Sequence, residues 1–135
     1  MTEKEVKAKL YRVRDLIAEE QRIREQMQKL KDRQLSITQQ LSDMPRGGTP
    51  FTTLDYVIGM EELYNIFTDT LAKEMQAYKE ALLMINTLSG WEREALVRYY
   101  LMSETWEQVA VHIGKGYRWT MTLHKRAIKK LAKAC

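Results

Sequence analysis

Residues 3–42 contain neither glycine nor proline and are rich in Glu, Lys, Arg, Gln and Leu. These residue types are strong helix formers, and a helix of about 40 residues would be a rod of roughly 60 Å. A single rod of this kind cannot bury an apolar side by itself, so that side must pack against another helix. The segment therefore predicts an all-α protein in which long helices pair.

The apolar residues of this first segment recur at heptad spacing. Alternating steps of three and four residues between them are typical of a coiled coil. Polar residues in such a seam are costly to bury, and two alternatives remain for them: they specify register or oligomeric state, or the helix is half exposed there. One seam position takes Val6, Val13, Glu20, Met27, Gln34 and Leu41, and the other takes Leu16, Ile23, Leu30 and Ile37, with Leu10 and Ile17 widening the stripe.

The densest group of helix-breaking residues, DMPRGGTPFTT, covers residues 43–53 and predicts a loop. A second helical pattern follows it and extends to Leu88. Two long helices around a loop of about ten residues predict a long antiparallel hairpin, a coiled-coil-like arm over residues 1–88, which we expect to form a homodimer. The apolar face predicted for the second helix consists of Val57, Tyr64, Leu71, Met75, Tyr78, Leu82 and Ile85.

Residues 89–135 predict three shorter helices. Ser89 with Glu92, and Thr105 with Gln108, have the spacing of capping boxes and predict two helix starts. Gly114 predicts the end of the second helix, and the third begins after Gly116. The residues expected to be buried are Leu96, Val97, Tyr100 and Leu101 in the first helix, Trp106, Val109, Ala110 and Ile113 in the second, and Trp119 or Thr120 with Leu123, Ala127 and Leu131 in the third. A short helix, a glycine-containing turn and a longer helix together form a helix-turn-helix unit.

Positive charge is concentrated in this C-terminal part. Residues 1–89 carry 13 Lys/Arg and 14 Asp/Glu, whereas residues 90–135 carry 9 Lys/Arg and 4 Asp/Glu. After Glu107 there are seven basic residues and no acidic one. Because the second helix of a helix-turn-helix unit enters the major groove of DNA, the charge lies on the element that would face phosphates. This arrangement indicates double-stranded DNA as a partner; a solvated basic face is the alternative.

Three segments of this region resemble region 4 of bacterial sigma-70 factors: residues 94–99 (EALVRY), 105–110 (TWEQVA) and 127–131 (AIKKL). The Trp after the cap, Gly116-Tyr117 before the last helix, and Leu123-His124-x-x-Ala127 are more similar to phage transcriptional regulators of the RinA/ArpU type. The resemblance covers residues 89–132. It implies a sigma region 4-like helix-turn-helix and a DNA-binding activator of phage or prophage genes that acts beside host RNA polymerase.

The same resemblance implies the DNA-binding residues. Tyr117, Arg118, Met121, Thr122 and Lys125 match groove-facing positions, and Arg98 matches a phosphate contact. The full predicted set is Arg98, Thr105, Lys115, Tyr117, Arg118, Met121, Thr122, Lys125 and Lys129. The chain departs from the pattern at Gly116, a weaker cap than Ser or Thr, and at Met121 and Thr122, where sigma factors favour longer polar side chains. We therefore do not expect a sigma-like promoter sequence as the target.

Other classes of function find little in the sequence. Gly114-Lys115-Gly116 lacks the spacing of a P-loop, and the two histidines have no cysteine or carboxylate cluster at metal-ligand spacing. We therefore predict no catalytic residue, metal or cofactor. No apolar segment approaches the roughly 20 residues of a membrane span. The single Cys135 forms no internal disulfide, which fits a reducing compartment. We expect a cytoplasmic protein near the nucleoid of a bacterial host.

The leading interpretation is a sequence-specific transcriptional regulator that acts as an activator, with bacterial RNA polymerase as a further candidate partner. Two alternatives remain. A phage DNA-packaging component such as a small terminase subunit also joins a helix-turn-helix to an oligomerising helical part. The second alternative is a coiled-coil interaction protein that does not bind DNA. Oligomeric state and DNA affinity at low salt distinguish the three.

Overall fold

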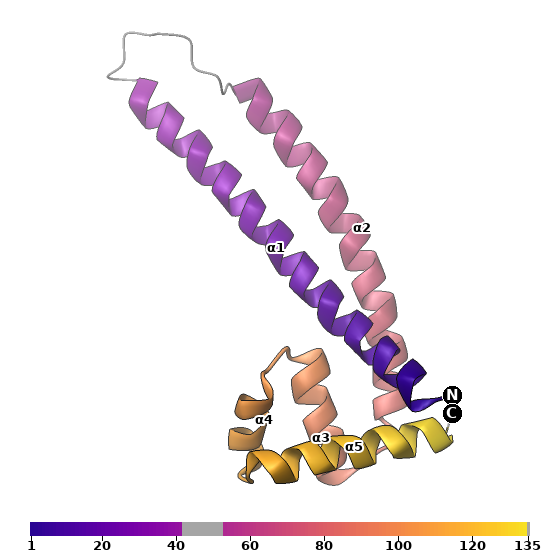
Figure 1. Ribbon diagram of the computed structural model, residues 1–135. Coiled ribbons are helices and arrows are strands. Elements are labelled where there is room, and N and C mark those ends of the chain that lie inside the picture. The colour runs from indigo at the N-terminus through magenta and orange to yellow at the C-terminus, as the bar shows by residue number, and fades with distance from the viewer. Residues whose placement is uncertain (42–52, 135) are drawn as a thin grey trace. The chain divides into compact units, whose positions relative to one another are not determined.

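The protein is all-α wherever its structure is described, and no strand occurs in those residues (Figure 1). A computed structural model describes the backbone of residues 1–41 and 53–134 and their side chains apart from those of 37–41. The elements are α1 (Glu3–Leu41), α2 (Thr53–Ile85), α3 (Gly90–Leu96), the π-helical segment η1 (Val97–Leu101), α4 (Trp106–Ile113) and α5 (Tyr117–Ala134). Of the predicted loop 43–53, all but Thr53 lies outside the described residues, as does Cys135. None of the described helices is long and apolar enough to cross a membrane.

The chain divides into two compact units, which are described separately here. The first unit combines residues 1–18 with residues 73–135, and the second consists of residues 19–72. The sequence predicts a boundary between residues 88 and 89, but the start of α1 and the end of α2 belong to the same unit as α3, α4 and α5. The helix-turn-helix candidate is therefore packed with residues from both ends of the chain.

The core of the first unit joins side chains from all five described α-helices and from η1. Leu123, Ala127 and Leu131 of α5 are buried as predicted, together with Thr120. Trp119, the alternative to Thr120, is 39% exposed, because α5 turns Thr120 inward at that position. The main cluster consists of Val6, Leu10 and Val13 of α1, Ala77, Ala81, Met84 and Ile85 of α2, Leu88, Leu96, Tyr100 and Leu101, and Ala127, Ile128 and Leu131 of α5. A smaller cluster of Ala95, Val109, Ile113 and Leu123 lies between α3, α4 and α5.

In the second unit, α1 and α2 run in opposite directions along each other. The Arg24 guanidinium lies 5.0 Å from the ring centroid of Phe67. Further along α1, Leu30 lies beside Gly59, where an added Cβ would be 3.0 Å from its Cδ2. Later positions on α1 therefore contact earlier positions on α2, as in an antiparallel pair. Of the two polar seam residues, Glu20 is almost fully buried and its carboxylate binds Arg24 in an ion pair of 2.9 Å.

The predicted apolar face of α2 is wrong for four of its residues. Val57 and Tyr64 in the second unit and Met75 and Tyr78 in the first are exposed. Leu71, Leu82 and Ile85 of the predicted face are buried or half-buried as expected. Buried or half-buried positions outside that face include Tyr56, Met60, Leu63, Phe67 and Thr70 in the second unit and Ala77, Ala81 and Met84 in the first. Both sets of positions have heptad spacing, so periodicity alone does not distinguish them. The small residues Ala77 and Ala81 allow close packing of helices, and the larger outer residues do not need burial for the helix to form.

Of the three helix-end signals predicted between α3 and α5, the structure confirms two. Ser89 precedes α3 as predicted, but its side chain makes no capping hydrogen bond, so the expected Ser89–Glu92 box is wrong. The capping box of Thr105 and Gln108 at the start of α4 is confirmed, with both hydrogen bonds present. Gly114 ends α4 at φ 80°, a left-handed conformation that favours glycine.

A buried hydrogen bond connects η1 to α5 in the first unit. The Tyr100 hydroxyl lies 2.8 Å from Nε2 of His124, and both side chains are buried. Burial lowers the pKa of His124 to about 4, and the positive charge of Lys7 lowers it as well. Burial also raises the pKa of Tyr100 above its ordinary value. Both groups are therefore neutral at pH 7, and His124 is a structural residue.

This buried histidine predicts a specific loss of stability in acid. The unfolded chain takes up a proton on His124 near pH 6.5, whereas the folded chain resists protonation until about pH 4. The stabilising effect of the neutral ring is thus complete above pH 6.5 and is lost as the pH falls from 6.5 to 4. Between pH 7 and pH 4.5, the free energy of unfolding should fall by about 2 kcal/mol more in the wild type than in His124→Gln. Urea unfolding followed by circular dichroism measures this difference, and parallel pH profiles of the two proteins would contradict it.

Candidate nucleic-acid interface

The start of α4 is fixed by the side chain of Thr105. Its hydroxyl oxygen accepts a hydrogen bond from the Gln108 backbone N–H at 3.2 Å. The side-chain Oε1 of Gln108 in turn accepts one from the Thr105 backbone N–H at 2.9 Å. Two N–H groups that a helix start leaves without partners are satisfied in this way. Thr105, one of the predicted DNA-binding residues, is exposed and has a capping role.

Three residues, 114–116, separate α4 from α5. The N–H groups of Gly114 and Lys115 both donate to the Ala110 carbonyl, at 2.9 and 3.2 Å, and close the end of α4. The Gly116 carbonyl then accepts hydrogen bonds from the N–H and the hydroxyl of Thr120, at 3.1 and 3.0 Å, and opens α5. The turn is therefore held by backbone hydrogen bonds on both sides, which sets the direction in which α5 leaves.

The outer face of α5 carries a row of cations. Arg118, Thr122, Lys125 and Lys129 are separated by steps of four, three and four residues, which places them on one side of a helix. All four are exposed, and they lie opposite the buried Ala127. No described acidic residue forms an ion pair with Arg118, Lys125 or Lys129. We call Arg118, Lys125 and Lys129 the cation row.

The remaining predicted residues of α5 and the turn lie at the edge of this face. Tyr117 and Lys115 are exposed, and Met121 is partly buried. The Thr122 hydroxyl donates to the Arg118 carbonyl at 3.0 Å, within the helix. Lys115 Nζ lies 5.7 Å from the ring centroid of the exposed Trp119. The structure thus brings together all the predicted residues from 115 to 129 on one side of α5 and its preceding turn.

Two other basic residues of α5 are neutralised within the fold. Glu92 of α3 is buried, and its Oε1 lies 3.1 Å from Arg126 Nε and 2.9 Å from Lys130 Nζ. The carboxylate that we expected to cap α3 therefore holds α5 against α3. Arg126 and Lys130 are thereby paired within the fold, whereas the cations of the cation row are not.

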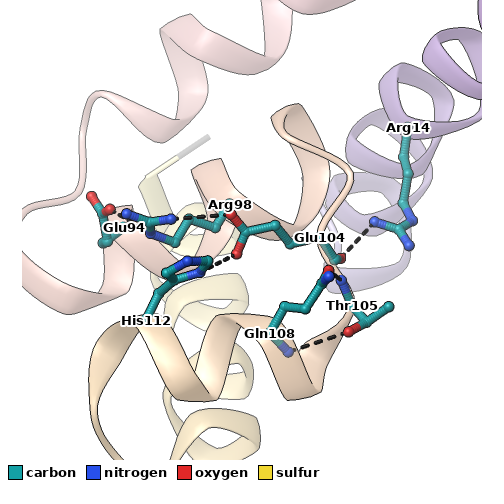
Figure 2. A network of polar contacts seen from close by, with 7 residues as sticks. All are labelled: Arg14, Glu94, Arg98, Glu104, Thr105, Gln108 and His112. Atoms are coloured by element: carbon teal, nitrogen blue, oxygen red, sulfur yellow. Dashed lines mark hydrogen bonds and ion pairs between the residues drawn. The ribbon is translucent and has the colours of Figure 1, made fainter.

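Arg98 is also committed to ion pairs. Its guanidinium binds Glu94 at 2.7 Å and Glu104 at 3.0 Å, and its side chain is only 24% exposed. Desolvation lowers the pKa of Arg98, but its hydrogen bonds to the two carboxylates raise it above the ordinary value. The second oxygen of Glu104 binds Nδ1 of His112 at 2.8 Å (Figure 2). This network connects η1 to α4, and it leaves Arg98 a weaker candidate for a phosphate contact than the cation row.

Arg14 of α1 supports the same network from the other side. Its Nη1 donates to the main-chain carbonyls of Tyr99 at 2.6 Å and Glu104 at 3.0 Å, and its guanidinium lies 4.1 Å above the Tyr99 ring. These carbonyls lie where the backbone leaves the π-helical segment through Ser103, whose φ is 57°. Figure 2 shows Arg14 directed toward the backbone of Glu104. One arginine therefore fixes the entry to α4.

Sequence reasoning missed Arg14 and Glu104 as positioning residues. Arg14 is 85 residues away from Tyr99, and no local pattern connects them. Glu104 precedes an N-cap, where a carboxylate has no characteristic spacing to its partners. The stacking of Trp106 on Tyr99, with 3.9 Å between ring centroids, was likewise not visible in the sequence, although Trp106 was expected to pack.

Comparison with known proteins adds no family to this picture: no family model matches the chain, and no curated protein or solved structure matches it either. The site is a basic helix face of defined direction, held by the turn that Gly114 closes, by ion pairs from α3 and η1, and by hydrogen bonds from Arg14 of α1.

Glu104→Ala should destabilise the first unit. It removes the ion pair to Arg98 and the hydrogen bond to His112, and it leaves a partly desolvated arginine with Glu94 alone. We expect the free energy of unfolding to fall by about 2 kcal/mol, as measured by urea denaturation at pH 7. Glu107→Ala is the matched control, because Glu107 is an exposed acidic residue three positions along the chain, on the first turn of α4, and it should cost less than about 1 kcal/mol. Equal losses in the two variants would contradict the role given to Glu104.

Proposed function

We propose that this protein is a sequence-specific DNA-binding transcriptional regulator whose α4 and α5 form a helix-turn-helix unit. The observation that carries the proposal is the cation row: three exposed cations without acidic partners on the outer face of the helix that follows a short helix and a three-residue turn. In a helix-turn-helix unit this second helix is the one that enters the major groove. The resemblance of residues 89–132 to sigma region 4 and to phage regulators of the RinA/ArpU type supports the same assignment.

The proposed complex has two energetic parts. Lys125 and Lys129 neutralise phosphates and supply affinity that falls as salt concentration rises, because counterions are released on binding. Arg118 is the second residue of α5, near the helix end that enters the groove in such units. A bidentate contact of its guanidinium with a guanine would supply sequence specificity. Tyr117 and Met121 border it and would contact sugar or base methyl groups.

The fold supports this mechanism by presenting a rigid surface. The capping box of Thr105, the left-handed Gly114 and the Glu92 clamp on Arg126 and Lys130 hold α5 at a set angle to α4. A preorganised face loses little conformational entropy on binding. Regulation beside host RNA polymerase, in the cytoplasm of a bacterial host, is part of the proposal and rests on the resemblance alone.

The direct test is selection of duplexes of about three helical turns, roughly 30 base pairs, from a randomised pool by the full-length protein. Fluorescence anisotropy then compares the selected duplex with a scrambled one at two salt concentrations. We expect tighter binding to the selected duplex and weaker binding to both at the higher salt concentration. Absence of binding at low salt would overturn the proposal and favour an interaction protein. A large closed ring of subunits in light scattering would instead favour the packaging alternative.

Variants of α5 separate sequence choice from phosphate binding. Arg118→Ala should lose about 1–3 kcal/mol on the selected duplex and much less on the scrambled one. Lys125→Ala should weaken both complexes alike and lower the salt slope by about one unit. Lys130→Ala is the matched control, because it removes a lysine of the same helix that Glu92 already binds. A Lys130 variant that behaves like the Lys125 variant would show that net charge, and not the cation row, determines binding.

A further inference from the structure

The second unit has an apolar stripe on the outer side of α2. Leu54, Val57 and Tyr64 are more than half exposed there, and Leu71 is partly buried. Single exposed apolar residues are ordinary on a protein surface, but a row of them on one helix face marks an interaction site. We call these four residues the outer stripe; three of them, Val57, Tyr64 and Leu71, belong to the face that the sequence predicted as buried.

The spacing of the outer stripe is that of a helix–helix seam. With Glu61 and Thr68 included, its positions from Leu54 to Leu71 follow alternating steps of three and four residues. The inner seam of α2, from Tyr56 to Thr70, has the same spacing and faces α1. A helix with two adjacent heptad seams is suited to pack against two neighbouring helices, as in a bundle, and α1 accounts for one of them.

A groove lies next to the outer stripe, between α1 and α2. It has a volume of about 260 Å³ and is lined by Met27, Phe67 and Tyr64, with Arg24, Gln28 and Lys31 of α1. Tyr64 belongs to both the stripe and the groove wall. An apolar floor beside cationic side chains suits an amphipathic helix that carries acidic residues.

The α2 helix itself has that charge. Residues 53–72 contain four acidic residues and no basic one, whereas residues 22–33 of α1 contain five basic residues and two acidic ones. One acidic residue, Glu61, lies within the outer stripe between Val57 and Tyr64. The surface therefore carries an apolar centre with negative charge on its α2 side and positive charge on its α1 side.

A surface that carries both halves of a complementary pair fits a copy of itself. In a two-fold symmetric interface the same patch meets its own image, so each charge of one sign requires a charge of the other sign in the same patch. Charge patches of a single sign would instead require a partner with the opposite charge. The charges of Glu61 and Lys31 around the outer stripe meet the symmetric requirement.

We propose that the outer stripe and its groove form a self-association interface that binds a second copy of this chain. The outer stripe of each copy lies along the groove of the other, so that Tyr64 packs against apolar groove residues and Glu61 faces the cationic α1 side of the partner. The result is a symmetric dimer built from four helical segments. The pairing involves residues 19–72 alone, and it stands whether or not α5 binds DNA.

The test is sedimentation equilibrium of the full-length protein and of two matched variants. Tyr64→Glu places a charge in the outer stripe, where the wild-type side chain is 59% exposed. Ile66→Glu places the same charge on the same helix, at a side chain 50% exposed but off the stripe. Both substitutions are at exposed positions, so both chains should keep the wild-type helical content and unfolding transition.

We expect a wild-type dimer at micromolar concentrations, weakened on the order of 100-fold by Tyr64→Glu and left intact by Ile66→Glu. A monomeric wild type would overturn the inference, and so would equal effects of the two variants or a closed ring of many copies. A wild-type monomer that still binds the selected duplex would overturn only this inference. A dimer that binds no DNA would overturn only the proposed function.

Discussion

The first turns of α1 pack against the C-terminal helices, and the rest of the first unit depends on this packing. Val6, Leu10 and Val13 belong to the same buried cluster as Ile128 and Leu131 of α5. Without these side chains the inner face of α5 would lose a large part of its apolar cover, and each large side chain removed from a core costs about 2–5 kcal/mol. The helix-turn-helix candidate is therefore not an independent C-terminal domain in energetic terms.

The same constraint explains how a small unit presents a defined basic surface. Polar contacts add to the apolar core in positioning α4 and α5. Arg14 binds the backbone before α4, Glu104 connects η1 to α4, and Glu92 binds α5. Glu92 and Glu104 are mostly buried and paired with cations, so removing one of them leaves its partners without compensation. The cation row of α5 lies outside this network. The ion pairs of the fold thereby determine which charges remain for a ligand.

Local signals in the sequence predicted local structure well, and they failed where two patterns competed. The Thr105 box and Gly114 are decided by a few neighbouring residues, and both are as predicted. At Ser89 the box failed because Glu92 has stronger partners 34 and 38 residues away in Arg126 and Lys130. In α2, two sets of positions have the same heptad spacing, and only packing against α1 selects the inner one. The contacts of Arg14 depend on the tertiary fold and have no local signature at all.

The two proposals have a joint consequence for DNA recognition. A symmetric dimer would carry two copies of α5, so once one has bound, the second meets its half-site at a high effective concentration. The cation rows of the two α5 helices would then bind DNA together. The dependence of affinity on salt concentration would reflect the phosphates that both rows neutralise. A half-site pair on the DNA would reflect the two-fold symmetry of the protein. Under this arrangement the residues that a sequence pattern assigned to the core of α2 contribute instead to how tightly, and at which spacing, α5 binds.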